Sequence, residues 1–248
     1  MGEALIKGLY KQNRLFVTEA NTARAAQLKK KYRLMVADLN TTVQEAGVLI
    51  LAVKPQDMEM LLQHIPVSKD KLFISIAAGL TTKYFEKRLG GKVRVVRTMP
   101  NMPAFIGEGI TAISAGKYAS AADIKMAQKI LGTIGQTVIV KESMIDAVTA
   151  VSGSGPAYVF LFVEQWMAAA KKLGFKDAEA KQLVYQTLTG SAHLLEKSEF
   201  DAGTLRTKVT SKGGTTQAAM DVFSKRKFDQ LMKDALTAAK KRAGELAK

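Results

Sequence analysis

The residues with the clearest chemical potential lie late in the chain, where residues 209–216 read VTSKGGTT. The segment leads into an apolar run at helical spacing, made of Ala218, Ala219, Val222 and Phe223. Two glycines and two threonines at a helix start leave backbone N–H groups free, and the helix dipole favours an anion there. Threonine is also an ordinary N-cap residue. The pattern therefore fits a site for a small carboxylate or phosphate as well as a plain cap.

Three further segments follow apolar runs that read as strands. They are Ala52–Gln56, Ile76–Gly79 and Arg97–Pro103. Ligands bind open parallel sheets at the carboxyl ends of their strands. The small residues of Ile76–Gly79 would let a flat ring approach the backbone, and two prolines stiffen the third segment. Each segment taken alone is also compatible with an ordinary turn.

The first half of the chain alternates short apolar runs with helix-like stretches. The expected strands are Leu15–Val17, Val48–Val53, Leu72–Ile76, Val93–Arg97, Thr111–Ser114 and Thr137–Val140. The expected helices among them include Thr22–Lys31 and Ala121–Leu131. The run Val48–Val53 is continuously apolar, as in strands that are covered on both faces. Strands alternating with helices predict βαβ units around a parallel sheet.

The second half shows helical periodicity and no convincing strand. One expected helix runs from Pro156 to Leu173 and is apolar on nearly every face, so it must be buried all round. In so small a domain, burial against a second subunit is the economical explanation. Further helices are expected over Asp177–Lys197, after Gly214 and at the chain end. We therefore predict an α/β domain over residues 1–142 and an all-helical domain over residues 143–248.

Composition excludes several classes of function. The 248 residues contain no cysteine, which removes disulfides, thiolate catalysis and zinc–thiolate sites, and a reducing cytoplasmic location fits. His64 and His193 are isolated, so no metal site is expected. Lysine and arginine outnumber acidic residues 37 to 22, but they are scattered, and we expect a solvated basic surface without a nucleic-acid partner. No apolar run approaches ~20 residues and no signal peptide is apparent, so we expect no membrane partner.

Five motifs occur in order along the chain. They are AVKPQ at 52–56, SIAAG at 75–79, MPNMPA at 99–104, SGSGPAY at 152–158 and LRTKVTSKGGTT at 205–216. With them the chain resembles the pyrroline-5-carboxylate reductase family, which completes proline biosynthesis. The resemblance implies an oxidoreductase that reduces 1-pyrroline-5-carboxylate to L-proline. It also implies a Rossmann-like domain, followed by a helical domain that forms an intertwined homodimer or a larger assembly of dimers.

The resemblance also assigns site residues. It implies that Glu199, Gly214, Thr215 and Thr216 bind the substrate, with the Thr216 hydroxyl facing the ring nitrogen as the catalytic group. The implied cofactor-binding residues are Asn40, Ala52, Val53, Lys54, Pro55, Ile76, Ala77 and Ala78. The implied cofactor is NADPH, with NADH as the alternative. Glu19 favours a ribose hydroxyl and so NAD, whereas Arg24 could meet a 2′-phosphate.

The chain departs from the family at its start. The family begins with a strand and a GxGxxG turn, and Met1–Ile6 resembles only the end of that turn and the helix after it. We expect the Rossmann-like domain to be incomplete at its N-terminus by roughly a dozen residues, the length of one strand and its turn. Lys212 stands where many members have proline, which leaves the N–H donors in place.

Two alternative functions follow. The first is a catalytically silent, truncated paralogue that only dimerises through its helical domain. The second is a β-hydroxyacid-type dehydrogenase, a group that normally carries a catalytic lysine on the interdomain helix. Here that helix begins Gly-Ser-Gly-Pro-Ala-Tyr instead.

Overall fold

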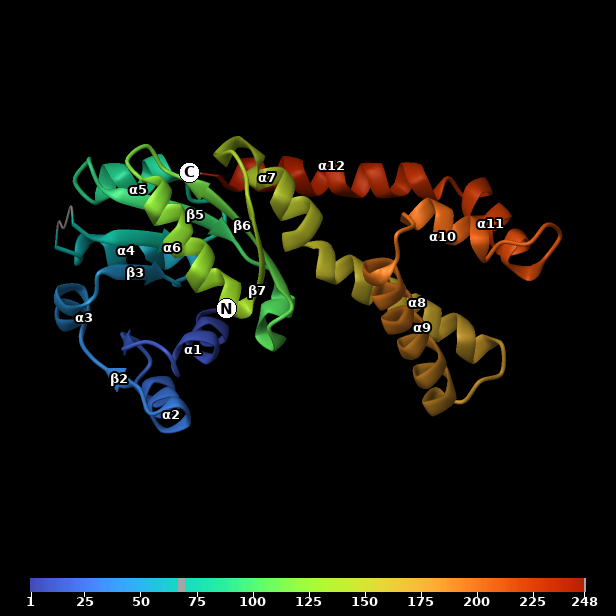
Figure 1. The fold of residues 1–248 in the computed structure, drawn as a ribbon, viewed down its shortest axis with the longest axis horizontal. Helices are drawn as coiled ribbons and strands as arrows, with labels where there is room; N and C mark the ends of the chain where they lie inside the picture. The colour runs from blue at the N-terminus through green and yellow to red at the C-terminus, as the bar shows by residue number, and fades with distance from the viewer. Residues whose placement is uncertain (67–69, 248) are drawn as a thin grey trace. The chain divides into compact units, whose positions relative to one another are not determined.

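The computed structural model describes residues 1–66 and 70–247, which form two compact units (Figure 1). Met1–Pro156 together with Ala238–Lys248 form the first, called here the α/β unit. Ala157–Thr237 form the second, called here the helical unit. The chain end thus returns to the α/β unit. The division at residues 142 and 143 stays a prediction from the sequence pattern.

The α/β unit alternates helices with short strands. Its helices are α1 (Gly2–Leu9), α2 (Thr22–Tyr32), α3 (Leu39–Glu45), α4 (Met58–Gln63), α5 (Thr82–Arg88), α6 (Ala121–Leu131) and α7 (Ile145–Val148). Its strands are β1 (Phe16–Val17), β2 (Met35–Val36), β3 (Val48–Leu51), β4 (Leu72–Ser75), β5 (Arg94–Met99), β6 (Gly109–Ala115) and β7 (Gly135–Ile139). The predicted strands are found, most of them with shifted ends. The two-residue β2 and the short helix α3 were not expected.

A five-stranded sheet in the order β3-β4-β5-β6-β7 forms the centre of this unit. Strands β3, β4 and β5 are parallel, and the register places Leu51 beside Ser75 and Ser75 beside Arg97. Their carboxyl ends therefore meet at one edge. One apolar cluster packs α4 and α5 against the sheet around Phe73 and Phe85. A second cluster, around Leu5 and Ile74, packs α1 and α6 against it.

The sheet departs from the expected all-parallel pairing at β6, which runs antiparallel to β5. The connection over residues 100–108 contains only the short 3₁₀ segment Met102–Ile106. A parallel crossover needs a dozen or more residues, so the chain turns back instead. Strands β1 and β2 form a separate two-stranded parallel sheet, and within the described residues no ladder joins β1 to β3.

The helical unit contains the rest of the chain's helices. They are α8 (Gly155–Lys172), α9 (Asp177–Lys197), α10 (Ala202–Lys208), α11 (Thr215–Lys225) and α12 (Phe228–Leu246). The first residues of α8 and the last turns of α12 belong to the α/β unit. This confirms the predicted all-helical second half, in which α10 was not foreseen. The unit's own core is small, made of Ala170, Ala180 and Val184.

Helix α8 exposes large apolar side chains in the single chain. Phe160 and Leu161 are each 57% exposed. By length and composition alone, the helical stretch 142–172 is apolar enough to cross a membrane, and 11% of its most apolar window is buried; one such helix is weak evidence for a membrane span. A count of uninterrupted apolar residues had not indicated this. The exposed side chains are those for which the sequence predicted burial against a second subunit.

Candidate functional site

Two of the predicted cofactor-binding segments lie side by side at the carboxyl edge of the sheet. Residues 52–55 follow β3 and are exposed, and residues 76–78 follow β4. The Ile76 N–H donates to the Leu51 carbonyl at 3.2 Å, which joins the ends of the two strands. The strand pairing thus brings together Ala52, Val53, Lys54 and Pro55 with Ile76, Ala77 and Ala78.

The segment after β4, residues 76–79, consists mainly of residues with small side chains. Ala77 is buried and its N–H donates to the Ser75 hydroxyl at 3.2 Å, whereas Ala78 is exposed. Gly79 has a φ of 74°, a left-handed conformation that glycine adopts readily. A Cβ at Gly79 would also lie 2.7 Å from the carbonyl oxygen of Leu246 in the last turn of α12. Residue 79 therefore has to be a glycine, because the end of α12 already lies against it.

Helix α1 begins at the same edge. A Cβ placed on Gly2 would lie 3.4 Å from the Cβ of Ala52, and no side chain caps the helix. A helix N-terminus carries free N–H groups and a partial positive charge, which suits a phosphate group. This edge therefore combines loops of small residues with an uncapped helix end, two features that are typical of dinucleotide-binding sheet edges.

Asn40 lies in the first turn of α3 and is exposed. Asp38 is the N-cap of this helix, so Asn40 lies in a helix, although the polar segment Asp38–Asn40 by itself favours a loop. The Thr41 backbone N–H and then its hydroxyl lower the pKa of the Asp38 carboxyl. Two hydroxyls, of Thr18 after β1 and Thr42, lie 2.8 Å apart and tie α3 to the end of β1. Asn40 is thus held beside that strand end.

Arg24 and Glu19 contact each other after β1. Arg24 Nε lies 3.5 Å from Glu19 Oε2, and Arg24 Nη2 lies 3.4 Å from Glu3 Oε2. Glu19 Oε1 also accepts the Asn21 N–H at 3.0 Å. The arginine side chain stays half exposed. One Glu19 oxygen closes its own turn and the other pairs with Arg24, and the arginine side chain is the more exposed of the two, 50% against 27%.

In the rigid loop after β5, the side chain of Asn101 has a structural role. Asn101 Oδ1 accepts the Ile110 N–H at 2.9 Å, so the side chain fixes the connection to β6.

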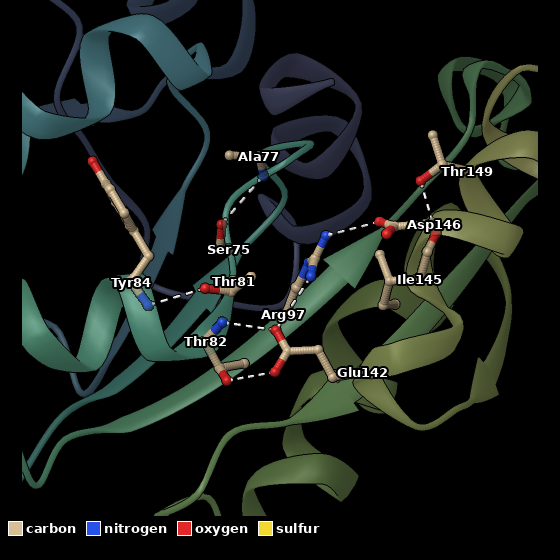
Figure 2. Close-up of polar contacts among 10 residues, drawn as sticks. All are labelled: Ser75, Ala77, Thr81, Thr82, Tyr84, Arg97, Glu142, Ile145, Asp146 and Thr149. Carbon is tan, nitrogen blue, oxygen red and sulfur yellow. Dashed lines mark hydrogen bonds and ion pairs between the residues drawn. The ribbon is translucent and has the colours of Figure 1, made fainter. Parts of the chain in front are cut away.

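The sequence pattern did not single out a buried arginine on β5. Arg97 is ion-paired with Glu142 and Asp146, as Figure 2 shows. A charged residue at the end of the apolar run VRVVR was the one signal in the sequence for it.

In the helical unit, α11 begins without a side-chain cap. Its N-cap is Gly214, preceded by Gly213 with a φ of 73°. The Gly214 N–H donates to the Ser211 carbonyl at 3.0 Å and so closes the turn before the helix. The first-turn N–H groups of the helix have no intrahelical acceptor. This is the open helix start that the GGTT pattern predicted.

The predicted substrate-binding residues occupy two places in the helical unit. Thr215 and Thr216 form the first turn of α11, the former exposed and the latter half-buried. Glu199 lies in the turn between α9 and α10 and is exposed. Among the described residues no hydrogen bond joins Glu199 to either threonine. The structure brings Gly214, Thr215 and Thr216 together and leaves Glu199 on its own turn.

The described residues contain no cluster of three or more His, Asp or Glu side chains that could hold a metal ion. The α/β unit offers a sheet edge with exposed loops beside an uncapped helix end. The helical unit offers an open helix start followed by two threonine hydroxyls, a feature that suits an anion.

Comparison with known proteins gives a consistent result. A family model described as pyrroline-5-carboxylate reductase dimerisation matches residues 142–246, and one described as NADP oxidoreductase coenzyme F420-dependent matches residues 1–79. The pyrroline-5-carboxylate reductase of Pseudomonas aeruginosa is 38% identical over 255 residues, covering 100% of this chain and 93% of the relative. Its Mycobacterium tuberculosis counterpart is 36% identical over 275 residues, covering 99% and 93%.

Solved structures agree. A pyrroline-5-carboxylate reductase from Coxiella burnetii superposes with a TM-score of 0.92 at 35% identity, covering 100% of this chain and 95% of the other. The Plasmodium falciparum pyrroline carboxylate reductase, solved with NADP bound, gives 0.87 at 30% identity with the same coverage. Both similarities extend over the α/β and the helical parts of the chain.

Proposed function

The chain belongs to the pyrroline-5-carboxylate reductase family, and we propose that the strand-end loops of its α/β unit and the open N-terminus of α11 carry out the family's reaction. The reaction reduces 1-pyrroline-5-carboxylate to L-proline. NADPH supplies a hydride to the imine carbon, the ring nitrogen keeps or gains a proton, and NADP⁺ is released. The observation that carries the proposal is the uncapped start of α11 at Gly214, followed by two threonines.

The substrate carries a carboxylate and a polar ring nitrogen, and α11 supplies a hydrogen-bonding partner for each of these two groups. The free first-turn N–H groups from Thr215 onward, next to Gly214, would donate to the carboxylate, assisted by the helix dipole. The Thr216 hydroxyl would hydrogen-bond to the ring nitrogen, and Glu199 would complete the substrate site. A protonated imine is already electrophilic, so orientation and exclusion of water supply most of the rate enhancement.

The cofactor would lie along the carboxyl edge of the sheet. Residues 52–55 and 76–78 would contact the ribose and nicotinamide, and Asn40 the adenosine side. The half-exposed Arg24 supports the assignment of the 2′-phosphate to this arginine, and hence NADPH over NADH. NADH would bind the same edge without that contact.

The protein is a homo-oligomer, because it contains the family's dimerisation domain. Its substrate is a small molecule. The finer statement is that two copies bury the apolar faces of α8 and its neighbours in a homodimer, from which larger assemblies can be built. Exposed Phe160 and Leu161 support it. We further propose a cytoplasmic location, with neither nucleic acid nor membrane as a partner.

The substitution Thr216→Val tests the catalytic assignment, since valine keeps the shape of threonine and loses the hydroxyl. We expect kcat for NADPH oxidation with 1-pyrroline-5-carboxylate to fall about 100-fold, the usual effect of losing one positioned proton-transfer or hydrogen-bonding group. Thr187→Val is the matched control, because the Thr187 hydroxyl only donates to the Leu183 carbonyl within α9 at 2.7 Å. A Thr216→Val enzyme with the kcat of the wild type contradicts the assignment. A folded wild-type dimer without turnover contradicts the function itself and favours a silent paralogue.

A further inference from the structure

A buried cation lies beside the sheet edge just described. Arg97 is 3% exposed, in β5 between β4 and β6. Its guanidinium Nη1 lies 3.3 Å from Glu142 Oε1, and Nη2 lies 3.8 Å from Asp146 Oδ1. A buried charge is tolerated only when it is paired and hydrogen-bonded. The two carboxylates therefore hold the short helix α7 and the turn before it against β5.

The Glu142 carboxylate has a second set of partners at the start of α5. It accepts the Thr82 backbone N–H at Oε1 and the Thr82 hydroxyl at Oε2, both at 2.7 Å. Thr82 is the first residue of α5, where a negative charge is also favoured by the helix dipole. One carboxylate thus joins Arg97 to the helix that follows the Ile76–Gly79 loop.

The other end of that loop is fixed to the same strand. Ser75, the last residue of β4, is paired with Arg97 in the sheet, and its carbonyl accepts the Thr98 hydroxyl at 2.9 Å. The Ser75 hydroxyl in turn accepts the Ala77 N–H. Figure 2 shows Ser75 and Thr82, which flank the loop in the sequence, on the same side of Arg97.

We propose that Arg97, acting through Glu142 with support from Asp146, is a positioning residue for the Ile76–Gly79 loop and so for the nicotinamide ring. The inference rests on the proposed function, which places the ring on this loop. Buried ion pairs contribute little net stability on average, and apolar replacements are often tolerated. Net stability therefore does not explain this buried cluster, whereas a role in fixing the geometry of the loop does. A misplacement of about 1 Å in the reacting groups can cost 100-fold in rate.

The test compares Arg97→Met, Glu142→Gln and Arg97→Lys with the wild-type chain. We expect Arg97→Met and Glu142→Gln to raise the NADPH dissociation constant about tenfold and lower kcat at least tenfold. The KM for 1-pyrroline-5-carboxylate and the oligomeric mass should stay within twofold. Arg97→Lys keeps a charge in place and should recover most of the NADPH affinity.

The control is Arg88→Met, at the other end of α5. Arg88 also pairs with a carboxylate, Glu59 at 2.9 Å, but it is partly exposed and remote from the loop. Its NADPH affinity should match that of the wild type. Amide hydrogen exchange without cofactor gives a second readout, because residues 76–82 should exchange at least about tenfold faster in Arg97→Met and be unchanged in Arg88→Met.

Wild-type-like NADPH affinity and loop exchange in a folded Arg97→Met enzyme would overturn the positioning role. If Arg97→Met does not fold, Glu142→Gln and Arg97→Lys decide the same question, since both retain most of the cluster. A wild-type chain that binds no NADPH would instead overturn the proposed function. The two failures are therefore distinguishable.

Discussion

Helices α6 and α11 are both 11 residues long, yet they begin in opposite ways. In α6 a capping box closes the first turn, because Ser120 Oγ accepts the Asp123 N–H at 3.2 Å and Asp123 Oδ2 accepts the Ser120 N–H at 2.8 Å. In α11 the N-cap is Gly214, and no side chain caps the turn. A helix that satisfies its own donors serves the fold, and one that leaves them open can serve a ligand.

The same contrast holds for the apolar residues of the two units. The α/β unit buries large side chains such as Phe73 and Phe85 completely. The helical unit has three buried apolar residues in its core cluster and leaves Phe160 and Leu161 exposed. One unit buries large apolar side chains in its own interior. For the other, we have proposed that a second copy of the chain covers the apolar faces and that the substrate carboxylate occupies the open helix start.

The largest expected effect comes from placing a charge on the open apolar face. Phe160→Glu puts a carboxylate where the account buries a phenyl ring, at a cost of several kcal/mol. We expect the dimer dissociation constant to rise about 1,000-fold or more, measured by analytical ultracentrifugation, with loss of NADPH oxidation at the same dilution. Lys125→Glu, on the exposed surface of α6, is the control and should keep the wild-type mass. A Phe160→Glu chain that stays dimeric would contradict the proposal that a second copy of the chain covers the exposed apolar face of the helical unit.

The next effect comes from closing α11 as α6 is closed. Gly214→Asp supplies a capping carboxylate that occupies the first-turn donors and repels the substrate. A Cβ at Gly214 would lie 2.5 Å from Ser211 Oγ, so the change is made in a Ser211→Ala background and compared with Gly214→Ala in that background. We expect the KM for 1-pyrroline-5-carboxylate to be about 100-fold higher with aspartate than with alanine, the loss of hydrogen bonds to a charged group. Equal KM values would show that the open turn does not bind the carboxylate.

The smallest effect concerns the closed helix. Burial acts to raise the pKa of Asp123, but hydrogen bonds from Ser120 and the charge of Arg94 outweigh it and lower the pKa. A lowered pKa in the folded state adds stability above the unfolded-state pKa near 4, and this stability is lost as the pH falls through the folded-state value. Asp123→Asn should therefore cost about 1 kcal/mol at pH 7 and progressively less below pH 4, measured by urea unfolding. If the difference in unfolding free energy between Asp123→Asn and the wild type does not change with pH, the charge of Asp123 does not stabilise the fold.

The sequence was sufficient for the parts of the molecule that depend on local pattern. Short apolar runs located the strands. The exposed α8 was anticipated from its lack of a polar face, and GGTT indicated the open start of α11. Local pattern could not reveal Arg97, whose acceptor Glu142 is 45 positions away. It also missed the helix that Asp38 caps before Asn40, because a polar Asp-Leu-Asn segment reads equally well as a loop. The antiparallel β6 depends on the length of a connection, and alternating elements alone do not predict it.

The most direct test of the account is to compare 1-pyrroline-5-carboxylate with 1-pyrroline, the same ring without the carboxylate, as substrates of the wild-type chain with NADPH. If the open turn of α11 recognises the carboxylate, kcat/KM should be at least about 100-fold higher for the acid, and Gly214→Asp should remove most of that ratio. Equal kcat/KM for the two rings, or a ratio that survives Gly214→Asp, would contradict the central claim that this helix start is the substrate site.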